Sequence, residues 1–121
     1  MIECFFFQDS GHRLFGALHS PDNLKNSSGL GVVFCGPFAE EKFWSQRVYT
    51  NFATHLASKG HHVLRFDYWG HGDSDGCFED STVKTRLQNI SGAVRWLKDQ
   101  KQIDKIGLFG LRFGATLAQL N

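Results

Sequence analysis

The spacing of apolar residues changes several times along the chain, and each change marks a predicted element. Short apolar or alternating stretches predict strands, whereas apolar residues that recur every three or four positions predict helices. On this basis the predicted strands are residues 2–8, 13–19, 30–35, 62–66 and 105–109. Helices are predicted at residues 44–59, after Ser81 or Thr82, and from Ala115 onward.

Each of the first two predicted helices has one apolar face. In the first helix this face consists of Trp44, Val48, Tyr49, Phe52, Ala53 and Leu56. In the second helix it consists of Val83, Leu87, Ile90, Val94 and Leu97. Gly60 is predicted to end the first helix, because glycine readily adopts the left-handed backbone that closes a helix.

The predicted elements follow the order β-β-β-α-β-α-β-α, and the turn Asp9-Ser10-Gly11 joins the first two strands as a hairpin. Strands that alternate with helices favour a parallel sheet with helices on both faces. We therefore predict an α/β fold with an N-terminal hairpin, followed by a mostly parallel, doubly wound sheet of about five strands. A single domain is expected to span residues 1–121.

Composition excludes several classes of protein. The chain is 41% hydrophobic and 21% charged with a net charge of +1, so nothing points to nucleic acid or to an acidic membrane as a partner. No apolar run approaches the ~20 residues of a membrane span, and the N-terminus lacks the basic start of a signal peptide. We interpret Cys4, Cys35 and Cys77 as free thiols in a reducing cytoplasm. No cofactor and no metal site is expected, because the histidines and cysteines lack metal-ligand spacing.

The pentapeptide Gly110-Leu111-Arg112-Phe113-Gly114 has the spacing of a nucleophile elbow, G-x-S-x-G, with Arg112 at the serine position. In an elbow the middle residue lies on a tight turn between a strand and a helix, and its side chain projects above the sheet edge. The pattern therefore predicts the scaffold of a serine hydrolase without its attacking hydroxyl.

Three motifs, each placed directly after a predicted strand, resemble the N-terminal half of the α/β-hydrolase fold. They are residues 34–38 (FCGPF), residues 67–74 (DYWGHGDS) and the elbow. The runs PFAEE and GLRFGA look more specifically like the hydrolase-like proteins associated with exosortase systems, which are similar to serine aminopeptidase-type hydrolases. The resemblance covers nearly the whole chain. It implies the strand order 1-2-4-3-5 and substrates with ester, thioester or amide bonds.

The sequence departs from that family at two points. Arg112 occupies the nucleophile position, and the family's acid and histidine come from beyond the elbow, whereas this sequence ends at Asn121. Because a catalytic triad acts as a unit, we expect no serine-type acyl transfer from this chain alone. The resemblance still places the two oxyanion-hole amides at Phe38 and Phe113, which are candidate anion-binding groups.

Arg112 would lie at the start of a helix, where the helix dipole disfavours a cation. A carboxylate from the facing loop could compensate, and we favour Glu41 over Glu40. The alternative is a small anionic ligand held by the guanidinium and the helix amides together. The candidate binding site is therefore Phe38, Glu41, Arg112 and Phe113, with no catalytic residue assigned.

Other reactive side chains have simpler interpretations. Cys35 ends a buried strand and is expected in the core. Asp73 and Ser74 belong to a loop rich in turn-forming residues, and nothing in the sequence places a partner beside His71. Two functions remain open: a hydrolase-like protein that is inactive as a stand-alone chain, and a non-catalytic binding or assembly module. The fifth strand would leave an open apolar edge, so we expect a homodimer or a complementing C-terminal chain.

Overall fold

The computed structural model describes residues 2–23, 27–36, 40–70, 74–76, 81–100 and 103–110, with only the backbone for residues 40–46. The elements are β1 (Ile2–Asp9), β2 (His12–His19), β3 (Leu30–Cys35), α1 (Glu40–Ser58), β4 (His62–Phe66), α2 (Val83–Lys98) and β5 (Lys105–Gly110). Their order confirms the predicted one as far as β5. The helix predicted after the elbow lies outside the described residues.

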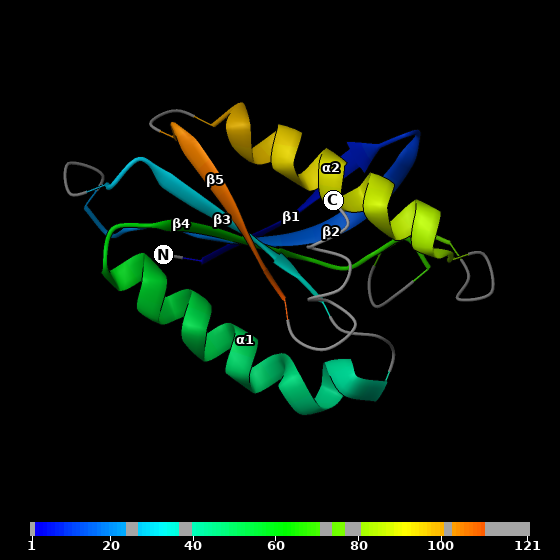
Figure 1. Cartoon of the computed structure of the whole chain (residues 1–121), viewed down its shortest axis with the longest axis horizontal. Coiled ribbons are helices and arrows are strands. Elements are labelled where there is room, and N and C mark those ends of the chain that lie inside the picture. Colours follow the sequence, from blue (N-terminus) through cyan, green and yellow to red (C-terminus); the bar gives the residue numbers. More distant parts are fainter. Residues whose placement is uncertain are drawn as a thin grey trace.

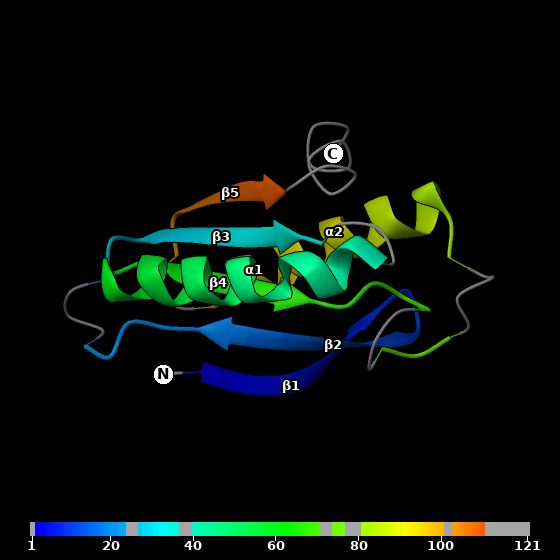
Figure 2. The same ribbon diagram turned by 90° about the horizontal axis from the view of Figure 1, so that it is seen from below.

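The five strands form one mixed sheet in the order β1-β2-β4-β3-β5. β2 pairs antiparallel with β1 and β4, whereas β3 pairs parallel with β4 and β5. Helices α1 and α2 cover opposite faces of this sheet (Figure 1), and β1 and β5 lie at its two edges (Figure 2). The predicted fold class and the strand order implied by the resemblance are both confirmed.

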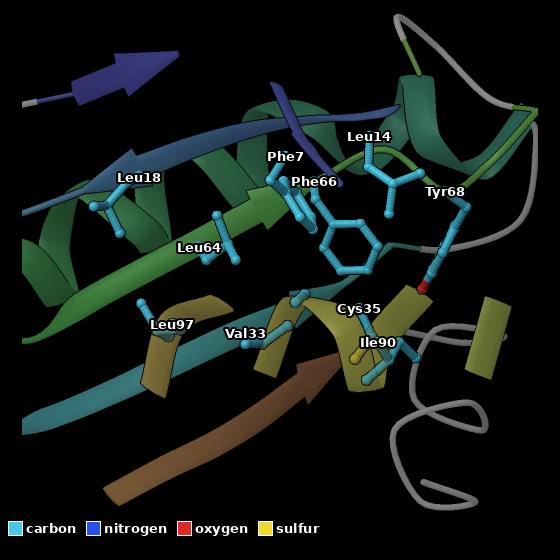
Figure 3. Close-up of a cluster of buried hydrophobic side chains, with 11 residues drawn as sticks. Phe7, Leu14, Leu18, Val33, Cys35, Leu64, Phe66, Tyr68, Ile90 and Leu97 are labelled. Atoms are coloured by element: carbon cyan, nitrogen blue, oxygen red, sulfur yellow. The ribbon is translucent and has the colours of Figure 1, made fainter. Parts of the chain in front are cut away.

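Each helix closes its own hydrophobic core against the sheet. The core under α2 is the larger and includes Phe7, Leu14, Leu64, Ile90 and Leu97 (Figure 3). The core under α1 consists of Phe34, Tyr49, Ala53 and Val63. Successive strand residues alternate between the two cores, as the period of two along a strand requires.

Two residues of the predicted apolar faces are instead exposed: Val48 at 54% and Val83 at 43%. In α1 the line of residues that faces the sheet runs through Tyr49, Ala53 and Ala57. Val48 lies about 100° around the helix from Tyr49 and therefore points past the contact. Val83 is the first residue of α2 and lies at the exposed N-terminal end of that helix.

The ends of the elements follow local capping rules. Gly60 has a φ of 95°. Its N–H donates to the Ala57 carbonyl over 3.0 Å, and the His61 N–H donates to the Leu56 carbonyl over 3.1 Å. These two bonds make a Schellman motif, which confirms the predicted end of α1. Helix α1 begins four residues earlier than predicted, at Glu40, because its polar first turn carries no apolar signal.

Candidate functional site

The carboxyl ends of the three parallel strands meet at one edge of the sheet, and the three sequence motifs begin there. Strands β3, β4 and β5 end at Cys35, Phe66 and Gly110, and Cys35 is paired directly with Gly110. Figure 2 shows β3 and β5 ending side by side. In open α/β sheets, ligands bind outside this carboxyl edge, so this edge is the candidate site.

The four predicted site residues are not all placed by the structure. Phe38, Arg112 and Phe113 lie outside the described residues. Glu41 belongs to the first turn of α1, but its side chain also lies outside them. The Glu41–Arg112 pair and the anion-binding amides therefore stay predictions.

Two tyrosines bind consecutive carbonyls at the end of β3. The Tyr49 hydroxyl donates to the Cys35 carbonyl over 2.8 Å, and the Tyr68 hydroxyl donates to the Gly36 carbonyl over 3.0 Å. Both side chains are buried, at 6% and 4% exposure. Burial raises the pKa of Tyr68 well above its ordinary value, so its hydroxyl stays protonated and remains a donor.

Cys35 belongs to the core and is unsuited to act as a nucleophile. Its side chain is 0% exposed. Burial raises the pKa of its thiol to about 12, because an apolar surrounding disfavours the thiolate. Since the thiolate is the reactive form of cysteine, this confirms the interpretation of Cys35 as a packing residue.

The segment after β4 is bound to β2 by hydrogen bonds that run in both directions. The Asp67 N–H donates to the Phe15 carbonyl over 2.9 Å. The Phe15 N–H donates to Ser74 Oγ over 2.8 Å, and the Ser74 hydroxyl donates to the Asp67 carbonyl over 2.5 Å. Ser74 thus serves the local backbone, as predicted, and its hydroxyl is committed to a carbonyl. His71 and Asp73 of the same motif lie outside the described residues.

The end of this segment is held by Arg13 and Trp69. Both Nε and a terminal nitrogen of Arg13 lie 3.3 Å from Asp75 Oδ1, and the Arg13 N–H donates to Oδ2 over 3.0 Å. The Trp69 indole stacks on His12 with ring centroids 4.4 Å apart. A Cβ at Gly76 would lie 2.1 Å from Trp69 Nε1, so only glycine fits beneath the indole.

A buried polar chain connects the hairpin, α2 and the β4 segment. The Asp9 carboxylate is 3% exposed and accepts from Asn89 Nδ2 over 3.0 Å and from the Arg95 guanidinium over 3.3 Å. Asn89 Oδ1 accepts the Trp69 N–H over 2.8 Å. The sequence interpretation missed this network. Asn89 gave little signal, because it lies beside the predicted apolar face of α2 and not within it.

A second buried polar pair lies away from the carboxyl edge. Arg65 Nε donates to His19 Nε2 over 2.8 Å, so the proton of the neutral imidazole sits on Nδ1. His19 Nδ1 has no hydrogen-bond partner among the described residues. Burial, and then the Arg65 charge, lowers the pKa of His19 to about 4. A cavity of about 320 Å³ adjoins this histidine, with Thr54 and Ala57 of α1 in its wall. The sequence carries no local sign of this pair.

The described residues contain no group of three His, Cys, Asp or Glu side chains able to hold a metal ion. Neither α1 nor α2 is long and apolar enough to cross a membrane.

Comparison with known proteins gives one family match. The model of a family described as X-Pro dipeptidyl-peptidase (S15 family) matches residues 12–120. An acyl transferase of Photobacterium phosphoreum is 28% identical over 99 residues, which is 81% of this chain and 31% of that protein. An acyl transferase of Aliivibrio fischeri is 31% identical over 71 residues. The chain thus spans about a third or less of the length of these curated relatives.

Solved structures share the fold. Est1E from Butyrivibrio proteoclasticus, with ferulic acid bound, is 26% identical, with a TM-score of 0.72 over 96% of this chain and 45% of that chain. An α/β serine hydrolase homologue from Coxiella burnetii is 23% identical, with a TM-score of 0.80 over 96% of this chain and 54% of that chain. The architecture described above is therefore that of an α/β hydrolase, and it corresponds to about half of the length of these solved chains. The likeness to the exosortase-associated subgroup stays a prediction.

Proposed function

Because the chain belongs to the X-Pro dipeptidyl-peptidase (S15) family, we propose that it forms the elbow-bearing half of an acyl-transfer domain. The bonds it would act on are esters, thioesters or amides. The observation that supports the proposal is that β3, β4 and β5, after which the three motifs begin, end at one edge of a β1-β2-β4-β3-β5 sheet in a chain that matches this family. Serine hydrolases and acyl transferases share the same first step, attack on an acyl carbonyl, and differ in the acceptor that later takes the acyl group.

We further propose that residues 1–121 are inactive by themselves. The reason is Arg112: a guanidinium stays protonated in proteins and has no lone pair for attack on a carbonyl. Cys35 is buried with a raised pKa, and the Ser74 hydroxyl is bound to a backbone carbonyl. Neither of these described side chains replaces the missing hydroxyl. In this proposal the acid and the histidine would come from additional sequence or from a second polypeptide.

A second candidate function is a non-catalytic module that binds a small anion. Arg112 at the elbow favours this alternative, since a guanidinium beside free backbone amides suits a carboxylate, sulfate or phosphate. The amides of Phe38 and Phe113 would complete the site, and Glu41 would compete with the ligand for Arg112. A bidentate pair between Glu41 and Arg112 would leave no room for an external anion.

Either function would be accompanied by assembly through β5. This strand lies at the edge of the sheet, and its residues from Ile106 to Gly110 are only half-buried. A Cβ at Gly107 would meet none of the described residues within 4 Å. Unpaired apolar edges associate readily. We therefore propose that a second copy or a complementing chain adds a strand at β5, and light scattering at micromolar concentration should report more than a monomer.

Activity assays test the proposal directly. The purified chain should hydrolyse neither short-chain p-nitrophenyl esters nor an X-Pro p-nitroanilide above the rate of heat-denatured protein. Arg112→Ser should not rescue activity, because a serine without its base stays a weak nucleophile. Turnover proportional to protein concentration, or covalent labelling of that variant by a fluorophosphonate, would contradict the proposed inactivity.

Anion titration separates the two functions. If the chain is an anion-binding module, sulfate should raise the Tm of the wild type but not of Arg112→Met. A matched control is Lys59→Met, which removes one exposed positive charge just after the C-terminal end of α1, away from the carboxyl edge of the sheet. An equal response in all three proteins would reject a specific anion site at the elbow.

A further inference from the structure

We propose that Tyr49 and Tyr68 are positioning residues that set the direction in which the chain leaves β3. The inference rests on the proposed function, because it assumes that the turn after β3 carries an anion-binding amide, at Phe38. The observation behind it is the pair of buried hydroxyls bound to two consecutive carbonyls, those of Cys35 and Gly36, at 2.8 Å and 3.0 Å.

Consecutive carbonyls determine consecutive peptide planes. The Cys35 carbonyl lies in one plane with the Gly36 N–H, and the Gly36 carbonyl lies in one plane with the nitrogen of the next residue. Between these planes only the φ and ψ of Gly36 are free, and glycine restricts them less than any other residue. The two hydrogen bonds therefore fix the φ and ψ of Gly36, which has no side chain to restrict them. The orientation of the amides that follow Gly36 depends on these two angles.

The two hydroxyls approach from opposite faces of the sheet, and packing holds each ring in place. Tyr49 comes from α1 and lies in the core under that helix, with its ring centroid 5.4 Å from that of Phe34. Tyr68 follows β4 and lies in the core under α2, 5.1 Å from the Phe66 ring. Figure 3 shows the Tyr68 side chain extending from the end of β4 toward Cys35. Because both rings are fixed by their cores, their hydroxyls are fixed points for the backbone of β3.

The space around Gly36 supports the same role. A Cβ at this position would lie 3.6 Å from Tyr68 Cε2, which is ordinary contact distance. The Tyr68 ring thus packs against the backbone of Gly36, and the two hydroxyl bonds, not a side chain at this position, hold the residue. The ladder with β4 ends at Phe34 and that with β5 at Cys35. The two tyrosine hydroxyls therefore bind the backbone at the point where pairing with the neighbouring strands ends.

The test uses the full chain, labelled with ¹⁵N and ¹³C, as wild type, Tyr49→Phe, Tyr68→Phe and the double variant. Each change removes one hydroxyl and keeps the ring. Ile90→Val is the matched control, since it removes one methylene from the buried core without touching the two carbonyls. The readouts are the carbonyl shifts of Cys35 and Gly36, the amide exchange rate of Gly36, and the affinity for sulfate. Exchange at the core strand residue Val63 reports the change in global stability.

The expected result is local. In each tyrosine variant the carbonyl that lost its donor should shift, and exchange at Gly36 should quicken at least tenfold beyond the change at Val63. The control should quicken all amides alike. Sulfate affinity should fall at least fivefold in the double variant and stay unchanged in Ile90→Val.

Two outcomes are distinguishable from each other. Exchange at Gly36 that merely follows Val63 in every variant would overturn the positioning role, whatever the sulfate result. Wild-type protein that binds no sulfate would contradict the anion-binding function, and the exchange data would still decide whether the tyrosines direct the turn.

Discussion

Replacing Gly92 with alanine should destabilise the protein, although the same change stabilises most helices. Gly92 lies inside α2 and is buried. In an ordinary helix interior, glycine to alanine gains about 1 kcal/mol, because alanine loses less backbone entropy on folding. Here a Cβ would lie 2.5 Å from Asp9 Oδ1, 2.6 Å from its Cγ and 3.1 Å from its Cβ. Either the helix or the carboxylate must move.

The magnitude follows from what holds Asp9 in place. Moving the helix away from β1 disturbs the packing of a dense core, which costs about 1–3 kcal/mol. Rotating the carboxylate instead breaks its bonds to Asn89 and Arg95 and leaves a buried charged group unpaired, which costs about 1–3 kcal/mol or more. After subtracting the gain in helix propensity, the net loss of unfolding free energy should be about 1–2 kcal/mol. For a domain of this size, that lowers the Tm by roughly 4–10 °C.

Urea unfolding of a double-mutant cycle measures the effect. The four proteins are wild type, Gly92→Ala, Asp9→Ala and the double variant. In the Asp9→Ala background the carboxylate is gone, so Gly92→Ala should become neutral or stabilising. The coupling energy between the two sites should therefore be about 1–3 kcal/mol. Stabilisation of about 1 kcal/mol by Gly92→Ala alone, or additive effects of the two changes, would refute the contact between Asp9 and Gly92.

Three further predictions concern His19, the cysteines and Gly76. The free energy of unfolding should fall by about 2–3 kcal/mol as the pH drops from 6.5 toward about 4, because only the unfolded state protonates His19 in that window. In urea unfolding, the free energy of His19→Gln should depend less on pH, and the same pH dependence as the wild type would contradict the lowered pKa of His19. Peptide mapping after brief thiol alkylation should find Cys4 modified long before Cys35, since Cys4 is exposed and Cys35 is buried with a pKa of about 12; equal rates would show that the β3 end opens. Gly76→Ala should lower the free energy of unfolding by about 1–3 kcal/mol, because Gly76 has a φ of 95° and an added Cβ would clash with the Trp69 indole. A Tm equal to that of the wild type would reject the tight contact between Gly76 and Trp69.

Local patterns in the sequence determined the order of the elements and most of their limits. The spacing of apolar residues distinguishes strands from helices, because the local backbone geometry alone sets that spacing. Gly60 marked the end of α1 because its left-handed conformation is a property of one residue. The same reasoning failed at the start of α1, where the polar first turn gives no period to detect. The order of the strands in the sheet was predicted only from the family resemblance. The alternation of apolar and polar residues within a strand does not indicate which strands pair with it.

Only the tertiary structure decided which polar groups meet. Asn89 and Asp9 are 80 positions apart, and Arg65 and His19 are 46 positions apart. Tyr68 looked like part of a loop motif and Tyr49 like one more apolar residue of a helix face, yet both direct hydroxyls at the end of β3. A hydrogen bond between distant residues needs a donor and an acceptor placed within about 3 Å of each other. That placement depends on how strands twist and helices pack, and no spacing along the chain encodes it.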